Sequence, residues 1–133
     1  MLKSIRYLLT IIICLFVGAC QHTQDNEEPN TIRKVNLSKA ASFNVQLGLG
    51  YLKQGDRPRA KKKLLTALEQ QPDSADVNAA LAYYFEQTKE LEQAKKFYHK
   101  AITLSQNGGA QLNNYGAFLC RQGDYKNAET YFL

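Results

Sequence analysis

Cysteine, histidine and acidic side chains are the groups of this 133-residue chain that could carry catalytic or metal chemistry. The two histidines, His22 and His99, each stand alone, with no carboxylate pair beside them. The sequence contains no GxSxG, HExxH, P-loop or CxxC motif. The carboxylates of Glu86, Glu90 and Glu92 are expected on outward, solvated faces of helices. We therefore expect a protein that is not an enzyme, with no catalytic residue, no metal site and no small-molecule substrate.

Cys20 is the cysteine whose neighbours predict a reaction. It follows Val17, Gly18 and Ala19, and this quartet resembles a bacterial lipobox. Small residues at Gly18 and Ala19 would fit the cleft of a signal peptidase that cleaves between Ala19 and Cys20. The Cys20 thiol would take a diacylglycerol thioether, and the freed amine could take a further acyl chain. Several chains matter because one acyl chain gives only marginal membrane binding. Apart from this covalent lipid, no cofactor is expected.

The residues before this cysteine, 1–19, predict a signal peptide. Lys3 and Arg6 form a short basic start, and residues 8–17 are almost entirely apolar. This run is too short for a membrane-spanning helix, which needs roughly 20 apolar residues. Cys14 is one of the apolar residues of this leader. The alternative is an ordinary secretory signal that happens to contain a cysteine.

Residues 20–40 are expected to form the lipidated N-terminus and a flexible tether. The stretch 21–36 is polar and contains Pro29, a composition typical of a linker. Glutamine, not aspartate, follows the lipidated cysteine, and by resemblance to Gram-negative lipoproteins this favours sorting to the outer membrane. We therefore expect a lipid-anchored protein on the periplasmic face of the outer membrane.

The composition is that of a globular protein, with 44% hydrophobic and 22% charged residues. The formal net charge of +5 falls to +3 when Lys3 and Arg6 leave with the leader. That charge is too mild to require a nucleic-acid partner, and none is expected. The basic run 57–63, RPRAKKK, is expected to form a solubilising helix face, with binding to an anionic surface as the alternative.

The rest of the chain repeats itself every 34 residues. Two sets of small residues mark the period: Gly48, Ala82 and Gly116, and Ala60, Ala94 and Ala128. This pattern resembles the tetratricopeptide repeat, and steps of three and four between apolar residues predict amphipathic helices. The expected fold is an all-α solenoid of antiparallel helix hairpins. Its repeats are expected at 41–74, 75–108 and 109–133, the third one incomplete.

Turn and capping residues lie where the two helices of a repeat should meet. Gly55-Asp56 and Gly123-Asp124 combine a residue that tolerates the left-handed conformation with one that can cap the next helix. Pro58 follows in the first turn of a helix, where its missing N–H costs little. Because a solenoid needs a polar terminal cap, the unfinished third repeat predicts that the chain is the N-terminal portion of a longer protein.

The third repeat narrows the resemblance. Residues 112–120 read LNNYGAFLC, followed by Gly-Asp-Tyr at 123–125 and Ala-Glu at 128–129. Together with the leader and tether, this run resembles the PilF/PilW-type outer-membrane lipoproteins of type IV pilus biogenesis. The resemblance implies a pilotin, a six-repeat lipoprotein that binds the pilus secretin and promotes its localisation and multimerisation in the outer membrane.

By analogy with tetratricopeptide domains, the partner would lie in a concave groove lined by the first helix of each repeat. The mixture of apolar and polar groups expected there suits an extended or helical peptide. Val45 and Leu49 take the first places of the lysine and asparagine clamp that captures carboxyl termini in eukaryotic co-chaperones, so such a clamp is not expected. The expected groove residues are Val45, Leu49, Leu52, Ala79, Tyr83, Glu86, Asn113, Ala117 and Arg121.

Two alternative functions stay open on the sequence. A different outer-membrane, lipid-anchored repeat scaffold, acting in envelope protein assembly or on cell-wall hydrolases, would share every feature except the third-repeat run. A cytoplasmic co-chaperone would require residues 1–19 to be something other than an export signal.

Overall fold

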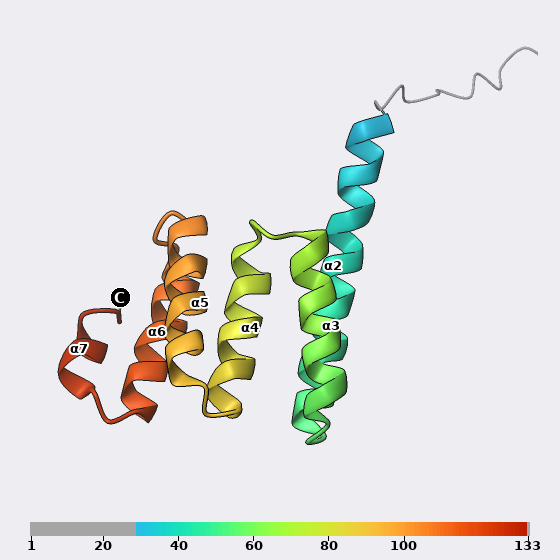
Figure 1. Ribbon diagram of the computed structural model, residues 1–133. Coiled ribbons are helices and arrows are strands. Elements are labelled where there is room, and N and C mark those ends of the chain that lie inside the picture. The colour runs from blue at the N-terminus through green and yellow to red at the C-terminus, as the bar shows by residue number, and fades with distance from the viewer. Residues whose placement is uncertain (1–28, 133) are drawn as a thin grey trace, which may run out of the picture.

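A computed structural model describes residues 29–132, and this part of the chain is built from helices without any strand. The helices pack as antiparallel hairpins, α2 with α3, α4 with α5 and α6 with α7, and the hairpins follow one another in a row (Figure 1). This arrangement confirms the predicted all-α tetratricopeptide solenoid. The bounds are α2 Pro29–Lys53, α3 Arg57–Gln70, α4 Ala75–Gln87, α5 Leu91–Leu104, α6 Gly109–Arg121 and α7 Tyr125–Glu129.

Two of the sequence predictions fall on residues that the structure does not describe. The signal peptide at 1–19, with its cleavage site at Ala19 and Cys20, lies outside the described residues, as does the first part of the tether. None of the helices within 29–132 has the length and apolar character needed to cross a membrane.

The first helix begins earlier than the sequence predicted. Residues 29–40, expected to belong to a flexible tether, form the first three turns of α2, so that part of the prediction is wrong. Pro29 suits a helix start, because its missing N–H is one that the first turn leaves unpaired. Residues 29–39 are exposed and project beyond α3 (Figure 1). An exposed helix can have the polar composition of a linker, which is why the sequence predicted a tether here.

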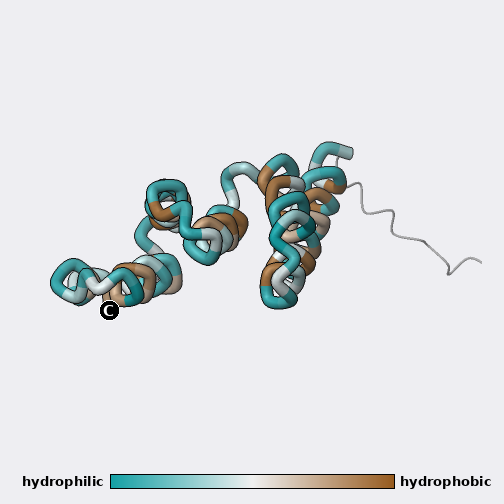
Figure 2. Tube along the Cα trace, turned by 60° about the horizontal axis from the view of Figure 1, so that its bottom comes forward, coloured by the Kyte–Doolittle hydropathy of each residue, from teal (hydrophilic) through white to brown (hydrophobic). Residues whose placement is uncertain are grey.

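Small residues let the two helices of the first hairpin approach closely. A Cβ at Gly48 of α2 would lie 2.6 Å from Leu64 Cγ and 3.3 Å from the carbonyl oxygen of Ala60. Leu64 and Ala60 of α3 are fully buried. Figure 2 shows hydrophobic segments on α2 and α3 where these helices lie side by side. The positions that mark the 34-residue period are therefore helix-packing positions.

The turns inside the first and third repeats have the predicted geometry. Gly55 and Gly123 adopt φ values of +80° and +82°, the left-handed region that glycine enters without strain. The side chain of Asp56 accepts a hydrogen bond from the backbone N–H of Arg59, and this bond, followed by the Arg59 side chain, lowers the pKa of Asp56. Asp124 caps α7 in the same way. The predicted turn and cap residues are confirmed.

Asn78 ties the second repeat to the loop before it. The consensus repeat carries tryptophan at this place, but here the buried amide donates to the carbonyl oxygens of Pro72 at 3.0 Å and Ser74 at 2.7 Å. One period earlier, Asn44 donates to Gln70 at 3.0 Å. Hydrogen bonds from asparagine thus hold α2 to α3 and α4 to its loop, where the consensus uses the bulk of an indole ring.

Candidate functional site: a groove along the first helices of the repeats

A cleft of about 430 Å³ runs along α2, α4 and α6, the first helices of the three repeats. The structure brings six of the nine predicted groove residues to its wall: Val45, Leu49, Ala79, Tyr83, Ala117 and Arg121. The sequence did not single out the others that line it: Asp76, Ala80, Tyr98, Gln111 and Asn114.

A second cleft of about 580 Å³ lies beside the first, between the ends of α2 and α4 and the start of α3. Leu49 and Tyr83 line both clefts, so the two form one continuous surface. We call the two clefts together the concave groove. The predicted residue Leu52 lines the second cleft, where the other lining residues are Lys53, Gly55, Arg57 and Gln87.

Asn113 is exposed and lines neither cleft, so its place in the predicted groove is wrong. Its neighbour Asn114 takes that position. Successive residues of an α-helix point about 100° apart, so an error of one position turns a side chain away from the groove.

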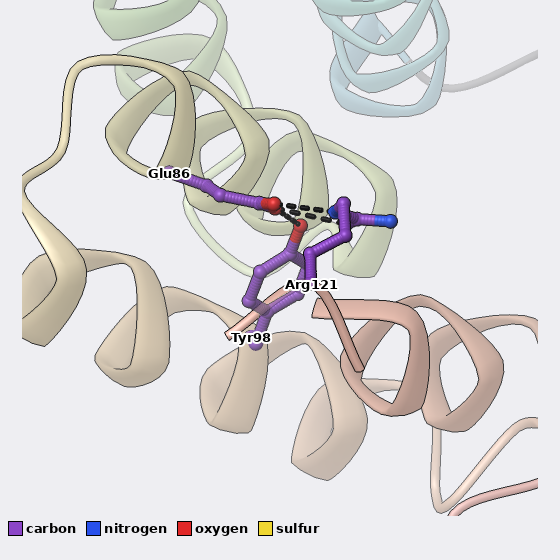
Figure 3. Close-up of polar contacts among 3 residues, drawn as sticks. All are labelled: Glu86, Tyr98 and Arg121. Carbon is purple, nitrogen blue, oxygen red and sulfur yellow. Dashed lines mark hydrogen bonds and ion pairs between the residues drawn. The ribbon is translucent and has the colours of Figure 1, made fainter. Parts of the chain in front are cut away.

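Glu86 is buried, with 3% of its surface exposed, so the expectation of a solvated carboxylate at this position is wrong. It lines neither cleft, so its place in the predicted groove is wrong as well. Its carboxylate accepts hydrogen bonds from the Tyr98 hydroxyl at 2.9 Å and from Nη2 of Arg121 at 2.9 Å (Figure 3). Nε of Arg121 donates to the same carboxylate. Glu90 and Glu92, in contrast, are exposed as expected. Glu86 therefore joins α4, α5 and α6 instead of facing water.

The electrostatics of this cluster follow from burial and charge. The hydrogen bond to Glu86 raises the pKa of Arg121, so the guanidinium stays charged. Burial, followed by the charge of Glu86, raises the pKa of Tyr98 well above its usual range. The hydroxyl of Tyr98 therefore remains a hydrogen-bond donor. At this end of the groove, the charges of Glu86 and Arg121 compensate each other.

A second polar cluster fixes the groove wall between α4 and α6. The amide of Gln111 donates to Asp76 at 2.9 Å, and Asn114 donates to the amide oxygen of Gln111 at 3.2 Å. Gln111 is buried, so this hydrogen bond holds the start of α6 against the start of α4. The partners lie 35 residues apart, and no local sequence pattern pointed to them.

The middle of the groove is apolar and aromatic. Tyr83 is 42% exposed although it is a large side chain, and it stands where the two clefts meet. Leu49 and Leu52 are half-buried beside it. An exposed aromatic ring beside partly covered leucines is typical of a contact site for a protein partner.

The basic run 57–63 divides between two surfaces. Arg57 lines the second cleft, whereas Lys61 and Lys62 are exposed and line neither cleft, as a solubilising face requires. Arg59 lies 4.6 Å from the ring centroid of Tyr51 and pairs with the carboxylate of Asp56.

Cys120 and His99 each contact residues of the helix packing and, within the described part of the chain, do not belong to a cluster of reactive groups. Cys120 is a half-buried free thiol at the edge of the hydrophobic core. His99 is exposed and lies against Tyr115, with ring centroids 4.6 Å apart. Residues 29–132 hold no group of three or more histidine, cysteine or acidic side chains that could bind a metal ion.

Comparisons with known proteins give relatives for this arrangement. Residues 45–109 match a family model described as tetratricopeptide repeat. Over 125 residues the chain is 35% identical to the "Type IV pilus assembly protein PilF" of Pseudomonas aeruginosa. The matched region covers 94% of this chain and 49% of that protein. The chain is also 31% identical over 131 residues to an uncharacterized protein of Haemophilus influenzae, and this matched region covers 98% of this chain and 70% of that protein.

A solved structure described as "Functional Characterization of Pseudomonas Aeruginosa pilF" is similar with a TM-score of 0.67. The match has 41% sequence identity and covers 72% of this chain and 43% of that chain. The chain thus spans about half the length of the pilus assembly protein that it matches.

Proposed function

Because this chain belongs to the tetratricopeptide-repeat proteins of the PilF type, we propose that it acts in type IV pilus biogenesis as a pilotin. It binds a segment of the pilus secretin in the concave groove and promotes localisation and multimerisation of the secretin in the outer membrane. The single observation that carries the proposal is the groove itself, in which the exposed ring of Tyr83 stands between half-buried leucines on the first helices of consecutive repeats.

The groove has the properties of a peptide site. Its middle is apolar, and Arg121 at its α6 end is already paired with Glu86, so an apolar segment could cover this arginine without leaving it unpaired. Aromatic residues at the centre of an interface supply much of the binding free energy. A secretin segment awaiting insertion exposes apolar surface that such a groove can cover.

The anchor is the second part of the proposal. A lipid on Cys20 holds the protein on the periplasmic face of the outer membrane, where the secretin assembles. In a Cys20→Ala variant, radiolabelled palmitate should no longer enter the protein, and the protein should leave the outer-membrane fraction. Continued incorporation of label would show that Cys20 is not the lipidated residue.

The groove is tested by a double variant, Leu49→Asp with Tyr83→Asp. It places charges where a partner would be desolvated, which is costly without a paired cation. Cells that carry it should lose heat-stable secretin multimers on an immunoblot and lose surface pili. Circular dichroism of the purified variant checks that it stays helical. Since Leu49 contacts the core whereas Tyr83 is exposed, the single variant Tyr83→Asp should disturb folding less and serves as a second test.

A matched control places the same charges outside the groove. Phe43 is 61% exposed and Tyr125 is 70% exposed, and neither lines a cleft of the concave groove. The double variant Phe43→Asp with Tyr125→Asp should leave multimers and pili unchanged. Normal multimers with a folded groove variant would refute binding through the groove.

A further inference from the structure

We propose that the partner segment in the concave groove carries an aspartate or glutamate side chain, which pairs with Lys53 and Arg57 while a neighbouring apolar side chain packs on Leu49 and Tyr83. This inference rests on the proposed function, because it describes the chemistry of the partner at the same groove. It assigns an acidic and apolar peptide as the occupant.

The turn between α2 and α3 brings both cations to one cleft. Lys53 is the last residue of α2 and Arg57 the first of α3, and Gly55 between them adopts a φ of +80°. Both cations are exposed and line the second cleft beside Tyr83. The left-handed turn therefore places two positive charges at the rim of an apolar surface.

No acidic residue of the described chain compensates these two charges. The cleft that they line contains no aspartate or glutamate, and neither cation takes part in an ion pair within residues 29–132. Asp56 lies in the same turn, but its carboxylate is taken by the side chain of Arg59 and by the backbone N–H at the start of α3. The α2–α3 end of the groove is thus left with two uncompensated cations.

The opposite end of the groove has no such surplus. Arg121 is paired with the buried carboxylate of Glu86, and Asp76 accepts a hydrogen bond from Gln111. Asp76 keeps its negative charge, because the amide of Gln111 is neutral. An acidic residue of a bound segment is therefore favoured only at the α2–α3 turn, and this would set the direction of the segment. Apolar contacts alone would not select a direction.

A peptide fits these observations better than a lipid surface or a nucleic acid. The cations lie in a concave groove, beside Leu52 and the ring of Tyr83, which a flat bilayer could not follow. A nucleic-acid site would need a wider run of cations along the groove, whereas the first cleft continues with apolar and amide side chains, the carboxylate of Asp76 and an arginine, Arg121, already paired with Glu86. An extended peptide presents both a carboxylate and apolar side chains within a few residues.

The test uses the whole chain and fluorescein-labelled decapeptide libraries with amidated C-termini. In each library a central leucine is fixed and a glutamate is placed at one other position in turn, and a parallel set carries glutamine in place of glutamate. Fluorescence anisotropy at low and at high salt measures the dissociation constants. We expect at least one glutamate library to bind about fivefold more tightly than its glutamine counterpart at low salt, with the difference shrinking at high salt.

Two charge-reversal variants separate the cleft from the net charge. Lys53→Glu with Arg57→Glu should abolish the preference for glutamate and favour the same libraries with lysine. Lys62→Glu with Lys96→Glu changes the net charge equally, but these exposed residues line neither cleft of the groove. This control should retain the preference of the unaltered chain.

The outcomes also distinguish this inference from the proposed function. Equal binding of glutamate and glutamine libraries, with both lost in Tyr83→Asp, would overturn the acidic pairing and leave the groove intact. Unchanged binding in Tyr83→Asp would instead refute the groove. Binding by no library would refute the inference.

Discussion

A methyl group added at Gly48 of α2 would be crowded, whereas one added at Gly50 of the same helix would meet open space. A Cβ at Gly48 would lie 2.6 Å from Leu64 Cγ and 2.8 Å from its Cδ2, whereas a Cβ at Gly50 would meet nothing within 4 Å. Gly48 serves close packing of α2 on α3. Gly50, half-buried in the same helix, has no such contact to explain the absence of a side chain.

We predict that Gly48→Ala and Gly50→Ala shift stability in opposite directions. Gly48→Ala overpacks the first hairpin and should lower the free energy of unfolding by about 1–3 kcal/mol. Gly50→Ala should raise it by about 0.5–1 kcal/mol, because alanine loses less backbone entropy in a helix. Urea unfolding followed by circular dichroism measures both, and equal shifts would contradict the packing described for Gly48.

The ion pair between Arg121 and Glu86 leads to a second prediction about single residues. Arg121→Ala leaves the buried carboxylate of Glu86 with Tyr98 alone, and should cost about 1–3 kcal/mol. That figure is below the usual cost for a fully buried pair because the Arg121 side chain is 47% exposed. Replacing both residues, as Glu86→Leu with Arg121→Met, should cost less than Arg121→Ala alone. Strict additivity in a double-mutant cycle would show that the pair does not interact.

The turn between the helices of a repeat differs in the second repeat. Lys89 occupies the place of Gly55 and Gly123, one period from each, and adopts a φ of 68°. Glu90 then occupies the place of the aspartate caps, with nearly the same backbone angles as Asp124, but makes no capping hydrogen bond. A lysine side chain is strained in the left-handed region, and glutamate is one methylene too long for the cap.

Converting this turn to the form of its neighbours should stabilise the protein. Lys89→Gly should contribute about 0.5–1 kcal/mol, since relief of strain exceeds the added entropy of the unfolded chain. Glu90→Asp should add about 0.5–1 kcal/mol by capping α5. Thermal unfolding of the double variant measures the sum. The reverse change in the third repeat, Gly123→Lys with Asp124→Glu, should destabilise the protein, and no effect in either turn would contradict the account.

The sequence predicts these elements well wherever their signals are local. The 34-residue period and the Gly-Asp pairs identified the hairpins, because packing and capping positions recur within a single repeat. The pairing of Glu86 with Arg121 could not be found this way, since it joins consecutive repeats and the local pattern placed Glu86 on an outward face. The spacing of 35 residues, one period and one position, is the signal that could have revealed it. The start of α2 was missed because its exposed turns are as polar as a linker.

Across the whole molecule, stability should be highest at α4. This helix packs against α2, α3, α5 and α6, whereas α7 packs against α6 alone. Because each repeat of a solenoid is held chiefly by its neighbours, the central helix should open least often.

Hydrogen exchange should therefore show a gradient along the chain. Backbone amides of α4 should be the most protected, and those of residues 29–39 and of α7 among the least. Mass spectrometry of peptic fragments measures the protection. Uniform protection over all helices would mean that the protein opens as one unit, and protection of residues 29–39 equal to that of α4 would contradict their exposure.

The projecting turns of α2 also have a mechanical consequence. Residues 29–39 extend about 16 Å as a helix, at about 1.5 Å per residue, whereas the chain from Cys20 to Pro29 spans at most about 30 Å when fully stretched. With a lipid on Cys20, a substantial share of the distance between membrane and groove would be a rod of fixed length, not slack chain. A force on the groove would then pass along the axis of α2 to the anchor once the short segment before it is taut. The helical part of this distance would stay constant, while the segment before it would set how far the groove can move from the bilayer.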